Sequence, residues 1–272
     1  YALIFAGLRL HKWALGAFIG LISNLIALLP LYRPLPPPCH ECRYDTLRIV
    51  QFNAFYKNRA TKDFVAWANM QPDLDVVVVV EAKTNGAALD ALKQTYPYAA
   101  GPHQHYRQGI AIFSRQPLLP TNALNPYVLN VNTTTRASAQ SLSIIAVHPP
   151  YSLTYQDWKN RNDYLMKVSQ LVKSHPLHNT IVVGDFNSSA WHPIIRNLEK
   201  EANLTNAQNG RGIAFTWHPI GWSNPLTGLM IDHLFLSTSM MAVDRYVMED
   251  RFGSDHAPVV TEIAIPAPSP LP

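Results

Sequence analysis

Short runs rich in valine and isoleucine recur along this chain, separated by segments with a helical pattern, and this alternation constrains the fold more than any other feature. Residues 76–80 are five consecutive valines, which indicates a strand buried on both faces. Leu165, Val168 and Val172 recur at the spacing of one helix face. Such interleaving predicts an α/β (α+β) fold in which helices lie outside the sheets.

These patterns define a specific set of elements. Thr61 is predicted to be the N-cap of one helix, and Pro193 suits the first turn of another. The predicted strands are Leu47–Asn53, Asp75–Glu81, Gly109–Ser114, Leu142–His148, Thr180–Asp185, Ile231–Ser237 and Pro258–Ile265, and the predicted helices are Thr61–Met70, Asp157–His175 and one that opens at 191–193.

The charge distribution bears on the choice of substrate. The formal net charge of the 272 residues is +4. Residues 1–45 hold four basic and two acidic residues, so the other 18 basic and 16 acidic residues leave the remainder at +2. A nearly neutral domain has no electrostatic footprint for nucleic acid, which weakens a nuclease interpretation without excluding it.

Residues 1–33 are largely apolar and are predicted to be a membrane anchor. No charged residue occurs from Trp13 to Tyr32, and twenty helical residues span roughly 30 Å, the thickness of a bilayer core. An uncleaved signal segment or a buried core helix is the alternative. Arg9 and Lys12 precede the stretch, so the positive-inside rule places the following domain outside the cytoplasm. For a bacterial protein this means the periplasm, with the anchor in the inner membrane.

Three further segments follow from composition. Residues 34–45 form a proline-rich linker, residues 46–265 the globular domain, and residues 266–272 a flexible tail. Cys39 and Cys42 lie in the linker. One CxxC pair is half of a structural zinc site, so these cysteines are expected to be surface thiols or a local disulfide.

Polar side chains are set at the ends of the predicted strands, where the edge of a sheet can bring them into one cleft. They include carboxylates, carboxamides and imidazoles, with no candidate cysteine or serine nucleophile. Mg²⁺ prefers oxygen ligands, so this inventory suits a hard divalent cation and phosphate-ester chemistry. The segments are Gln51-Phe52-Asn53, Glu81, Val147-His148-Pro149, Gly184-Asp185-Phe186-Asn187, Ile231-Asp232-His233 and Gly253-Ser254-Asp255-His256-Ala257-Pro258.

Individual motifs leave alternatives open. Glu81 emerges from a buried strand, where a charge is solvated, paired or metal-bound. Asp185 is predicted to orient a water or a leaving group and Asn187 to donate to a phosphoryl oxygen, with an Asx-type turn as the structural alternative. Asp232, interpreted as closing a different strand, is the predicted carboxylate partner of His256.

The other histidines differ in their expected roles. His148 is a candidate to protonate or hydrogen-bond a phosphate oxygen, or else a structural residue of a turn. His233 is predicted to point to the opposite face of its strand from Asp232 and is given no catalytic role. His103 and His105 are expected to be surface histidines, with substrate contact as the alternative.

In their order along the chain, Asn53, Glu81, His148 and the motifs at 184–187, 231–232 and 254–258 resemble the endonuclease/exonuclease/phosphatase (DNase I-like) superfamily. The chain looks like a membrane-anchored bacterial-type member, and the resemblance covers roughly residues 46–265. It implies a four-layer α/β sandwich of two packed mixed β-sheets flanked by helices, here preceded by a hydrophobic N-terminal helix. It also implies a Mg²⁺- or Mn²⁺-dependent phosphodiesterase or phosphatase.

For the metal, the resemblance implies that Glu81 is a ligand, that Asn53 lies nearby and that Asp255 supports the metal side of the site. Two departures concern the substrate. Valine, rather than the glutamine common in nuclease members, precedes Glu81, and no acidic residue follows closely after Asn53. Both put nucleic-acid specificity in doubt more than the catalytic core.

For catalysis, the resemblance implies that Asp185 and Asn187 orient the attacking water and the phosphate. His256, held by Asp232, would contact the scissile phosphate. His148 matches the imidazole of the deoxyribonuclease-like and sphingomyelinase-like branches. The implied reaction is in-line attack of water on phosphorus, and the substrate is nucleic acid, a phospholipid or a small phosphodiester.

A non-catalytic binding module that keeps the fold is the alternative from another class of function. Against it, filling every expected polar position costs stability unless a metal or substrate offsets that cost. The aromatic residues from Tyr151 to Trp158 are expected to pack on the sheet, with contact to acyl chains or stacking on bases as the alternatives. We expect a monomer that meets a membrane through its N-terminal segment.

Overall fold

The computed structural model of the protein describes residues 11–34, 43–82, 86–101, 109–120, 128–174, 179–221 and 227–267. The expectations for His103, His105, Cys39, Cys42 and most of the C-terminal tail lie outside these residues. The chain divides into two units. One contains helix α2 (His11–Tyr32) with residues 209–212, and the other contains the globular part.

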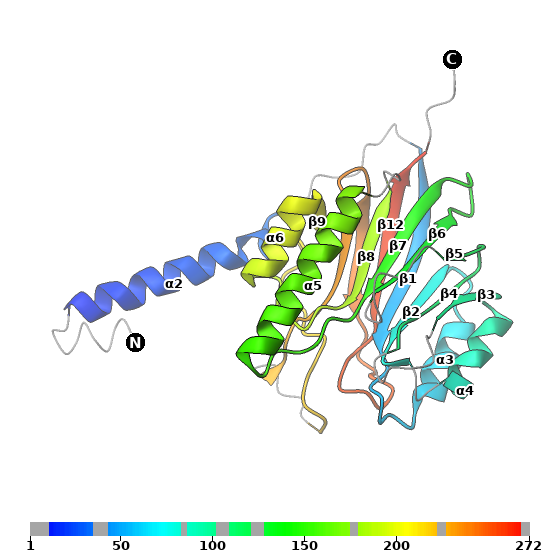
Figure 1. Ribbon diagram of the computed structural model, residues 1–272, viewed down its shortest axis with the longest axis horizontal. Coiled ribbons are helices and arrows are strands. Elements are labelled where there is room, and N and C mark those ends of the chain that lie inside the picture. Colours follow the sequence, from blue (N-terminus) through cyan, green and yellow to red (C-terminus); the bar gives the residue numbers. More distant parts are fainter. Residues whose placement is uncertain are drawn as a thin grey trace, which may run out of the picture. The chain divides into compact units, whose positions relative to one another are not determined.

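The strands of the globular unit form two six-stranded sheets, ordered β11-β12-β1-β2-β4-β3 and β5-β6-β7-β8-β10-β9 (Figure 1). Both sheets are mixed, because β1 and β2 are parallel, as are β7 and β8, while their other neighbours are antiparallel. The strands are β1 (Tyr44–Asn53), β2 (Val76–Val80), β3 (Tyr98–Ala100), β4 (Ala111–Ser114), β5 (Leu119–Pro120), β6 (Val128–Thr134), β7 (Ser141–Val147), β8 (Thr180–Asp185), β9 (Leu204–Asn206), β10 (Asp232–Ser237), β11 (Met241–Val247) and β12 (Val259–Pro266).

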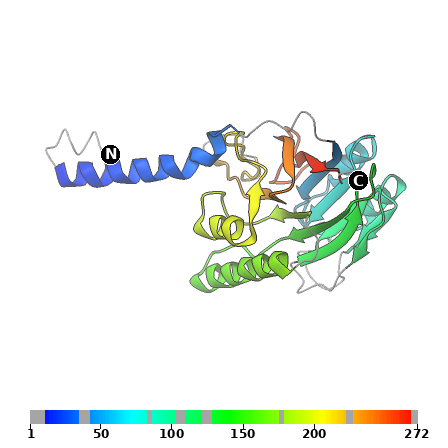
Figure 2. The ribbon, with the colours of Figure 1, turned by 90° about the horizontal axis from the view of Figure 1, so that it is seen from above.

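Helices cover the outer face of each sheet, so the globular unit has the predicted four layers. The first sheet carries α3 (Thr61–Asn69), α4 (Gly86–Leu89) and the short 3₁₀ helix η2 (Asp90–Gln94). The second sheet carries α5 (Tyr155–Ser174) and α6 (Pro193–Ala202). Figure 2 shows α5 and α6, in green and yellow, on one side of the sheets and the cyan α3 on the other. The predicted fold class is confirmed.

The five valines of β2 show how the sequence builds these layers. Val76, Val78 and Val80 belong to the core between the two sheets, whereas Val77 and Val79 face the core under α3. Successive side chains of a strand point to opposite faces, so a strand with apolar layers on both sides is apolar at every position.

The predicted start of α3 is wrong in one detail. Thr61 is the first helical residue rather than the N-cap, a position held by Ala60 without a side-chain bond. The backbone N–H of Ala60 instead donates to the Asn58 side chain (2.7 Å). This Asx turn orders the backbone before the helix. Thr61 itself is buried, and its hydroxyl has no hydrogen-bond partner among the described residues.

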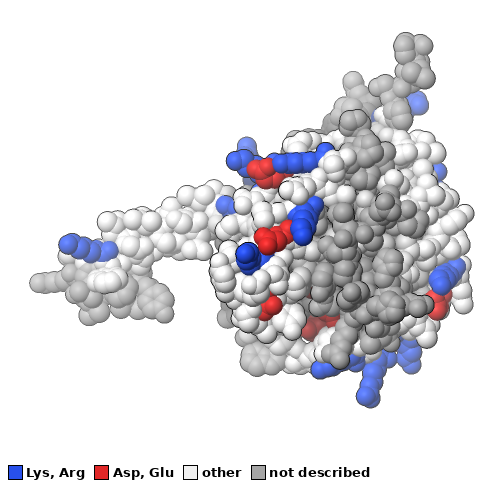
Figure 3. Space-filling model, in the orientation of Figure 1, with Lys and Arg blue, Asp and Glu red and all other residues white. Residues whose placement is uncertain are grey.

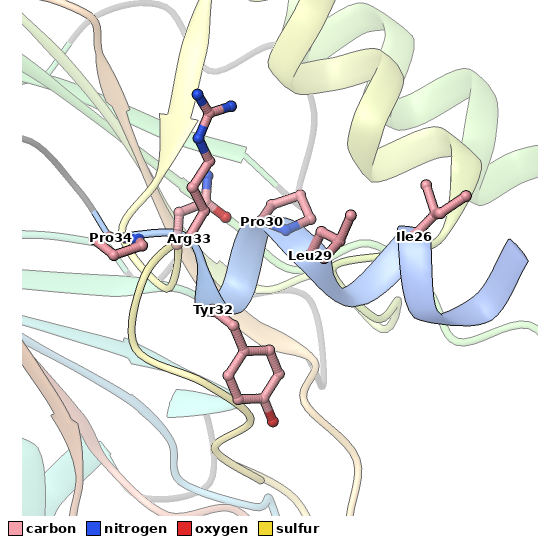
Figure 4. A pocket seen from close by; sticks show the side chains of 7 residues that line it. Ile26, Leu29, Pro30, Tyr32, Arg33 and Pro34 are labelled. Carbon is pink, nitrogen blue, oxygen red and sulfur yellow. The ribbon is translucent and has the colours of Figure 1, made fainter. Parts of the chain in front are cut away.

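Helix α2 is the one described helix that is long and apolar enough to cross a membrane, with a mean hydropathy of 2.1. Within its unit, Gly210 donates a backbone hydrogen bond to Pro30 (3.0 Å). An open hollow at the end of the helix is lined by apolar side chains and Arg33. Figure 4 shows Arg33 and Tyr32 pointing to opposite sides of the chain there. The hollow holds no group suited to catalysis among its lining residues.

Candidate active site

The two parallel strand pairs bring four of the predicted residues to one edge of the sandwich. Asn53 ends β1 opposite Val80 of the parallel β2, and Glu81 follows directly. In the second sheet, His148 follows β7 and Asp185 ends the parallel β8. Parallel neighbours end at the same edge of a sheet, so each pair delivers two polar side chains to the same place.

The other two motifs reach this edge by opening strands rather than by ending them. Asp232 is the first residue of β10 and lies opposite Asp185 of the antiparallel β8. Likewise, Asp255 and His256 precede β12, whose residue Val259 pairs with Gln51 of β1. The prediction that Asp232 closes a strand is therefore wrong. An antiparallel strand starts where its neighbour ends, which explains why these residues still join the site.

The side-chain amide of Asn53 connects the two sheets at the centre of the site. Its Nδ2 donates to Glu81 Oε1 (3.2 Å) and to Asp185 Oδ2 (3.1 Å), and it lies 3.4 Å from His256 Nε2. The Asn53 Oδ1 accepts from the N–H of Phe55 (3.0 Å), which fixes the orientation of the amide. The predicted convergence of Glu81, Asp185 and His256 is thus present in the structure.

The backbone of Glu81 has a positive φ, which is unfavourable for a residue other than glycine. Its φ is +56°, in the left-handed region that costs a non-glycine residue free energy. The N–H of Tyr56 donates to Glu81 Oε2 (2.9 Å). With Oε1 bonded to Asn53, both carboxylate oxygens are aimed by neighbours, and 17% of the side chain remains exposed.

His148 lies between two carboxylates. Its Nε2 is 3.8 Å from Glu81 Oε1 and 3.6 Å from Asp185 Oδ2. Its Nδ1 is buried and has no hydrogen-bond partner in the described chain. A turn histidine with a purely structural role would be expected to bond through its ring, so this geometry favours the site interpretation of His148.

His256 and Asp232 form a buried pair, joined by a bond of 2.8 Å between His256 Nδ1 and Asp232 Oδ2. Burial alone would lower the pKa of His256, but the charges of Asp232 and Asp185 outweigh it and raise that pKa to about 10. Burial alone would raise the pKa of Asp232, but the charge and hydrogen bond of His256 hold it below its ordinary value. The pair therefore presents an imidazolium, with Nε2 3.6 Å from Asp185 Oδ2.

The Asp185–Asn187 segment forms the Asx-type turn and also places Asp185 in the site, so both alternatives from the sequence apply to it. The N–H of Asn187 donates to Asp185 Oδ1 (2.8 Å), which is the Asx-type bond. At the same time Asp185 Oδ2 faces the site, and burial raises the pKa of Asp185 to about 6. The Asn187 side-chain amide donates one N–H to the Pro149 carbonyl (2.9 Å). The turn therefore holds one carboxylate oxygen of Asp185 and orients the other towards the site.

Asp255 lies beside the site with its carboxylate held by other groups. Its Oδ2 accepts from the indole N–H of Trp217 (3.0 Å), and the Ser254 hydroxyl lies 3.5 Å from its Oδ1. The Ser254 hydroxyl donates to the Asn53 carbonyl (2.8 Å). This links the segment of Asp255 to the end of β1.

His233 lies away from these residues. Its Nε2 contacts the Ser188 carbonyl (2.8 Å), and its ring packs edge-on against Phe186 with ring centroids 5.6 Å apart. Burial lowers the pKa of His233 to about 4, so the ring is neutral and donates to Ser188. These contacts agree with the prediction that His233 points away from Asp232.

Three residues that contact the site have no role assigned to them from the sequence. Gln51 donates to Asp232 Oδ1 (2.9 Å), and the Thr216 hydroxyl accepts from the N–H of Asp232 (3.1 Å). Arg161 of α5 is buried and donates to the Asn187 carbonyl (2.9 Å). Gln51 lies two residues before Asn53 on the same face of β1, a signal that could have identified it. Thr216 and Arg161 carry no comparable local signal.

Comparisons with known proteins identify the family and the fold. A family model described as the Endonuclease/Exonuclease/phosphatase family matches residues 50–256. A search of curated proteins found no match. Three solved structures share the fold: a humanized TDP2 of D. rerio (TM-score 0.64, 17% identity, 80% of this chain and 98% of that chain), a beta toxin mutant of Staphylococcus aureus with bound magnesium ions (0.59, 17%, 80% and 99%), and sphingomyelinase C of Streptomyces griseocarneus (0.59, 13%, 80% and 99%).

Proposed function

This chain belongs to the endonuclease/exonuclease/phosphatase family, and on that premise we propose that it is a divalent-metal-dependent phosphoesterase that hydrolyses a phosphodiester by in-line attack of water. The observation that carries the proposal is the convergence on one amide, since Asn53 contacts Glu81, Asp185 and His256 at 3.1 to 3.4 Å. A cluster of buried carboxylates and imidazoles costs stability unless a ligand offsets that cost.

We assign the cation, Mg²⁺ or Mn²⁺, to the carboxylate of Glu81, with Asn53 beside it and Asp255 supporting that side. Oxygen donors of this kind suit a hard divalent ion, and the exposed part of Glu81 gives access to it. Asp185, Asp232 and His256 also offer ligand atoms within 4.8 Å of one another. Because Asp232 and His256 already bond to each other, we favour the Glu81 side. When bound, the cation would neutralise charge on the phosphate.

We assign the other catalytic roles to four side chains of the site. The His256 imidazolium, held by Asp232, faces the phosphate through Nε2 and stabilises the charge that develops there. Asp185 orients the attacking water, because its Oδ2 points into the site. Asn187 has a second amide N–H beyond the one that Pro149 accepts, and we assign it to a phosphoryl oxygen. His148 supplies a second imidazole for proton transfer or hydrogen bonding.

Hydrolysis of bis-(p-nitrophenyl) phosphate with Mg²⁺ or Mn²⁺ tests the assignment. We expect Glu81→Ala and His256→Ala each to lower kcat/KM by about 10²-fold or more. Glu262→Gln, which alters a carboxylate in the middle of β12 opposite Arg48, is the matched control and should leave kcat/KM unchanged. Activity that survives either alanine substitution removes the catalytic assignment, and inactivity of the wild type with both metals would favour a binding module.

We further propose that α2 anchors the protein in a membrane, with the globular unit outside the cytoplasm. The support is the length and apolar composition of α2 together with Arg9 and Lys12 before its uncharged stretch. A reporter fused to the C-terminus tests the orientation. A reporter enzyme that is active only outside the cytoplasm should be active in this fusion. A reporter that is active only in the cytoplasm should be inactive in the same fusion, and its activity would overturn the orientation.

A further inference from the structure

The segment that follows His148 exposes large apolar side chains to solvent. Tyr151 is 57% exposed, Leu153 81%, Tyr155 76% and Trp158 41%. The rings of Tyr155 and Trp158 stack on each other with centroids 5.6 Å apart. The expectation that this segment packs on the sheet is therefore wrong for these four residues, which we call the apolar rim.

The apolar rim is adjacent to the candidate active site and is fixed in place. Tyr151 is three residues from His148, so at most about 11 Å of chain separates them. On one side, the Pro149 carbonyl accepts from Asn187. On the other, the Thr154 hydroxyl and Asp157 carboxylate cap the start of α5 (2.7 Å), which lies at the lower edge of Figure 1. Residues held at both ends keep their apolar groups in solvent, and no element among the described parts of the chain covers them.

We propose that the apolar rim docks on the surface of a phospholipid bilayer and that the substrate is a phosphodiester of a membrane lipid. The proposal rests on the phosphoesterase function proposed above and specifies its substrate class. Tyrosine and tryptophan prefer the bilayer interface, and an exposed leucine gains free energy by entering it. A rim beside the candidate active site would bring that site to the level of the headgroup phosphates.

Helix α2 would tether the globular unit to the bilayer on which the rim docks. Helix α2 has the length and hydropathy of a membrane span, and eleven residues, 33–43, separate it from β1. Fully extended, these residues reach at most about 40 Å. A globular unit on so short a linker stays close to the membrane surface that α2 enters, which makes this surface the available partner for the rim.

Nucleic acid fits the rim less well. Surfaces that stack bases pair their aromatic residues with a cationic groove, whereas the charges that accompany the rim in the sequence cancel: Asp157 and Asp163 stand beside Lys159 and the buried Arg161. Figure 3 shows basic side chains in separate groups on the visible face, one of them along its lower edge, and not as one strip across the molecule. The most exposed rim residue, Leu153, has no aromatic face to offer a base.

The first test compares two substrates of the full chain reconstituted through α2. The lipid probe is a vesicle of equal parts phosphatidylcholine, phosphatidylglycerol and sphingomyelin, assayed by ³¹P NMR for released headgroup. The soluble probe is bis-(p-nitrophenyl) phosphate. We expect Leu153→Asp combined with Tyr155→Ser to lower headgroup release about tenfold or more and to leave hydrolysis of the soluble ester within twofold.

Met70→Asp is the matched control for this comparison. Met70 is 72% exposed and follows α3. The carbonyl of the adjacent Gln71 accepts from Arg115, which follows Ser114 opposite the start of β2, so Met70 lies away from the strand ends that form the site. The control should change neither activity. Equal losses on both substrates in the double variant, or no loss on either, would overturn the docking surface. Single-stranded DNA serves as a third substrate, and a loss confined to its hydrolysis would assign the rim to base stacking instead.

The second test measures docking without catalysis. Brominated phosphatidylcholine in the vesicle should quench the fluorescence of Trp158, a contribution obtained as the difference between the wild type and Trp158→Phe. The same difference should vanish in the Leu153→Asp, Tyr155→Ser background. An absent difference in the wild type overturns docking. Quenching by an enzyme inactive on both esters would support the rim while refuting the proposed function, so the two failures are distinguishable.

Discussion

At the scale of single residues, the His256–Asp232 bond makes stability depend on pH. Asp232 raises the pKa of His256 to about 10 against burial, whereas an unfolded histidine titrates near about 6.5. The stabilisation is fully present below the unfolded pKa and is lost as pH rises through the folded one. We therefore expect the free energy of unfolding to fall by a few kcal/mol between about pH 6.5 and 10.

Urea unfolding with EDTA at several pH values across this window checks the prediction, with Asp232→Asn as the comparison. Lysine and tyrosine titration near the upper end affects both proteins equally, so the difference between the two curves isolates the pair. The curve of the variant should be flatter. A slope as steep in Asp232→Asn as in the wild type would contradict the assignment of the shift to Asp232.

Arg161 offers a second prediction at this scale. Its guanidinium is buried, its Nε has no partner in the described chain, and it holds the carbonyl of Asn187, whose φ is +48°. Burying a charge costs free energy, so Arg161→Met should change Tm by only a few degrees. Activity on the soluble ester should nevertheless fall about tenfold, because a small displacement of positioned groups is costly to rate.

Differential scanning fluorimetry and steady-state kinetics on the same samples separate the two effects. Arg196→Met is the control, since Arg196 is exposed on α6, and it should keep both Tm and kcat. If Arg161→Met lost activity only in proportion to a large fall in Tm, Arg161 would be structural and would have no positioning role.

At the scale of elements, the sequence predicts strands best where apolar layers cover both faces. The predicted strand Thr180–Asp185 coincides with β8, and the predicted strand Asp75–Glu81 extends one residue beyond β2 at each end. Strands β6 and β11 were not predicted, because polar residues such as Asn130, Asn132 and Asp244 interrupt the apolar pattern of their sequences. Both carry polar positions that packing, rather than local pattern, decides.

The same contrast applies to the site. Residues that follow a buried strand, such as Asn53, Glu81 and Asp185, could be placed together from the order of elements alone. The Thr216 bond to Asp232 could not, because Thr216 belongs to an irregular segment that meets the site through an isolated bridge between Trp217 and His256 and through the Trp217 bond to Asp255. Its position depends on long-range contacts that no local periodicity encodes.

The contact of β7 with β8 leads to a prediction about Gly184. Its φ is +149°, and a Cβ there would lie 1.9 Å from the Val147 carbonyl oxygen. Gly184→Ala should destabilise the fold by more than about 2 kcal/mol and reduce activity, because Val147 leads directly into His148. Urea unfolding measures the first effect. Gly86→Ala, where a Cβ meets nothing within 4 Å, is the control, and equal stability of the two variants would contradict the argument.

At the scale of the whole molecule, the site joins the two sheets. Asn53 and Glu81 come from the first sheet, and His148 and Asp185 from the second. The amide of Asn53 bridges them, so a ligand held at the site makes contacts that exist only when both sheets are folded and packed. Ligand binding should therefore stabilise the sandwich as one unit, because anything that binds the folded state alone shifts unfolding by mass action.

The expected ligand is the cation, and its binding can be measured by thermal unfolding, independently of activity. With free Mg²⁺ or Mn²⁺ at about 100 times its Kd, the linkage relation gives about 2.7 kcal/mol, or roughly 5 to 10 °C in Tm for a domain of this size. Glu81→Gln keeps the shape of the side chain but removes its charge, so the shift should largely disappear. Glu262→Gln should retain it. A Tm that does not respond to either metal, or responds equally in Glu81→Gln, would mean that Glu81 holds no cation and that its left-handed backbone serves another purpose.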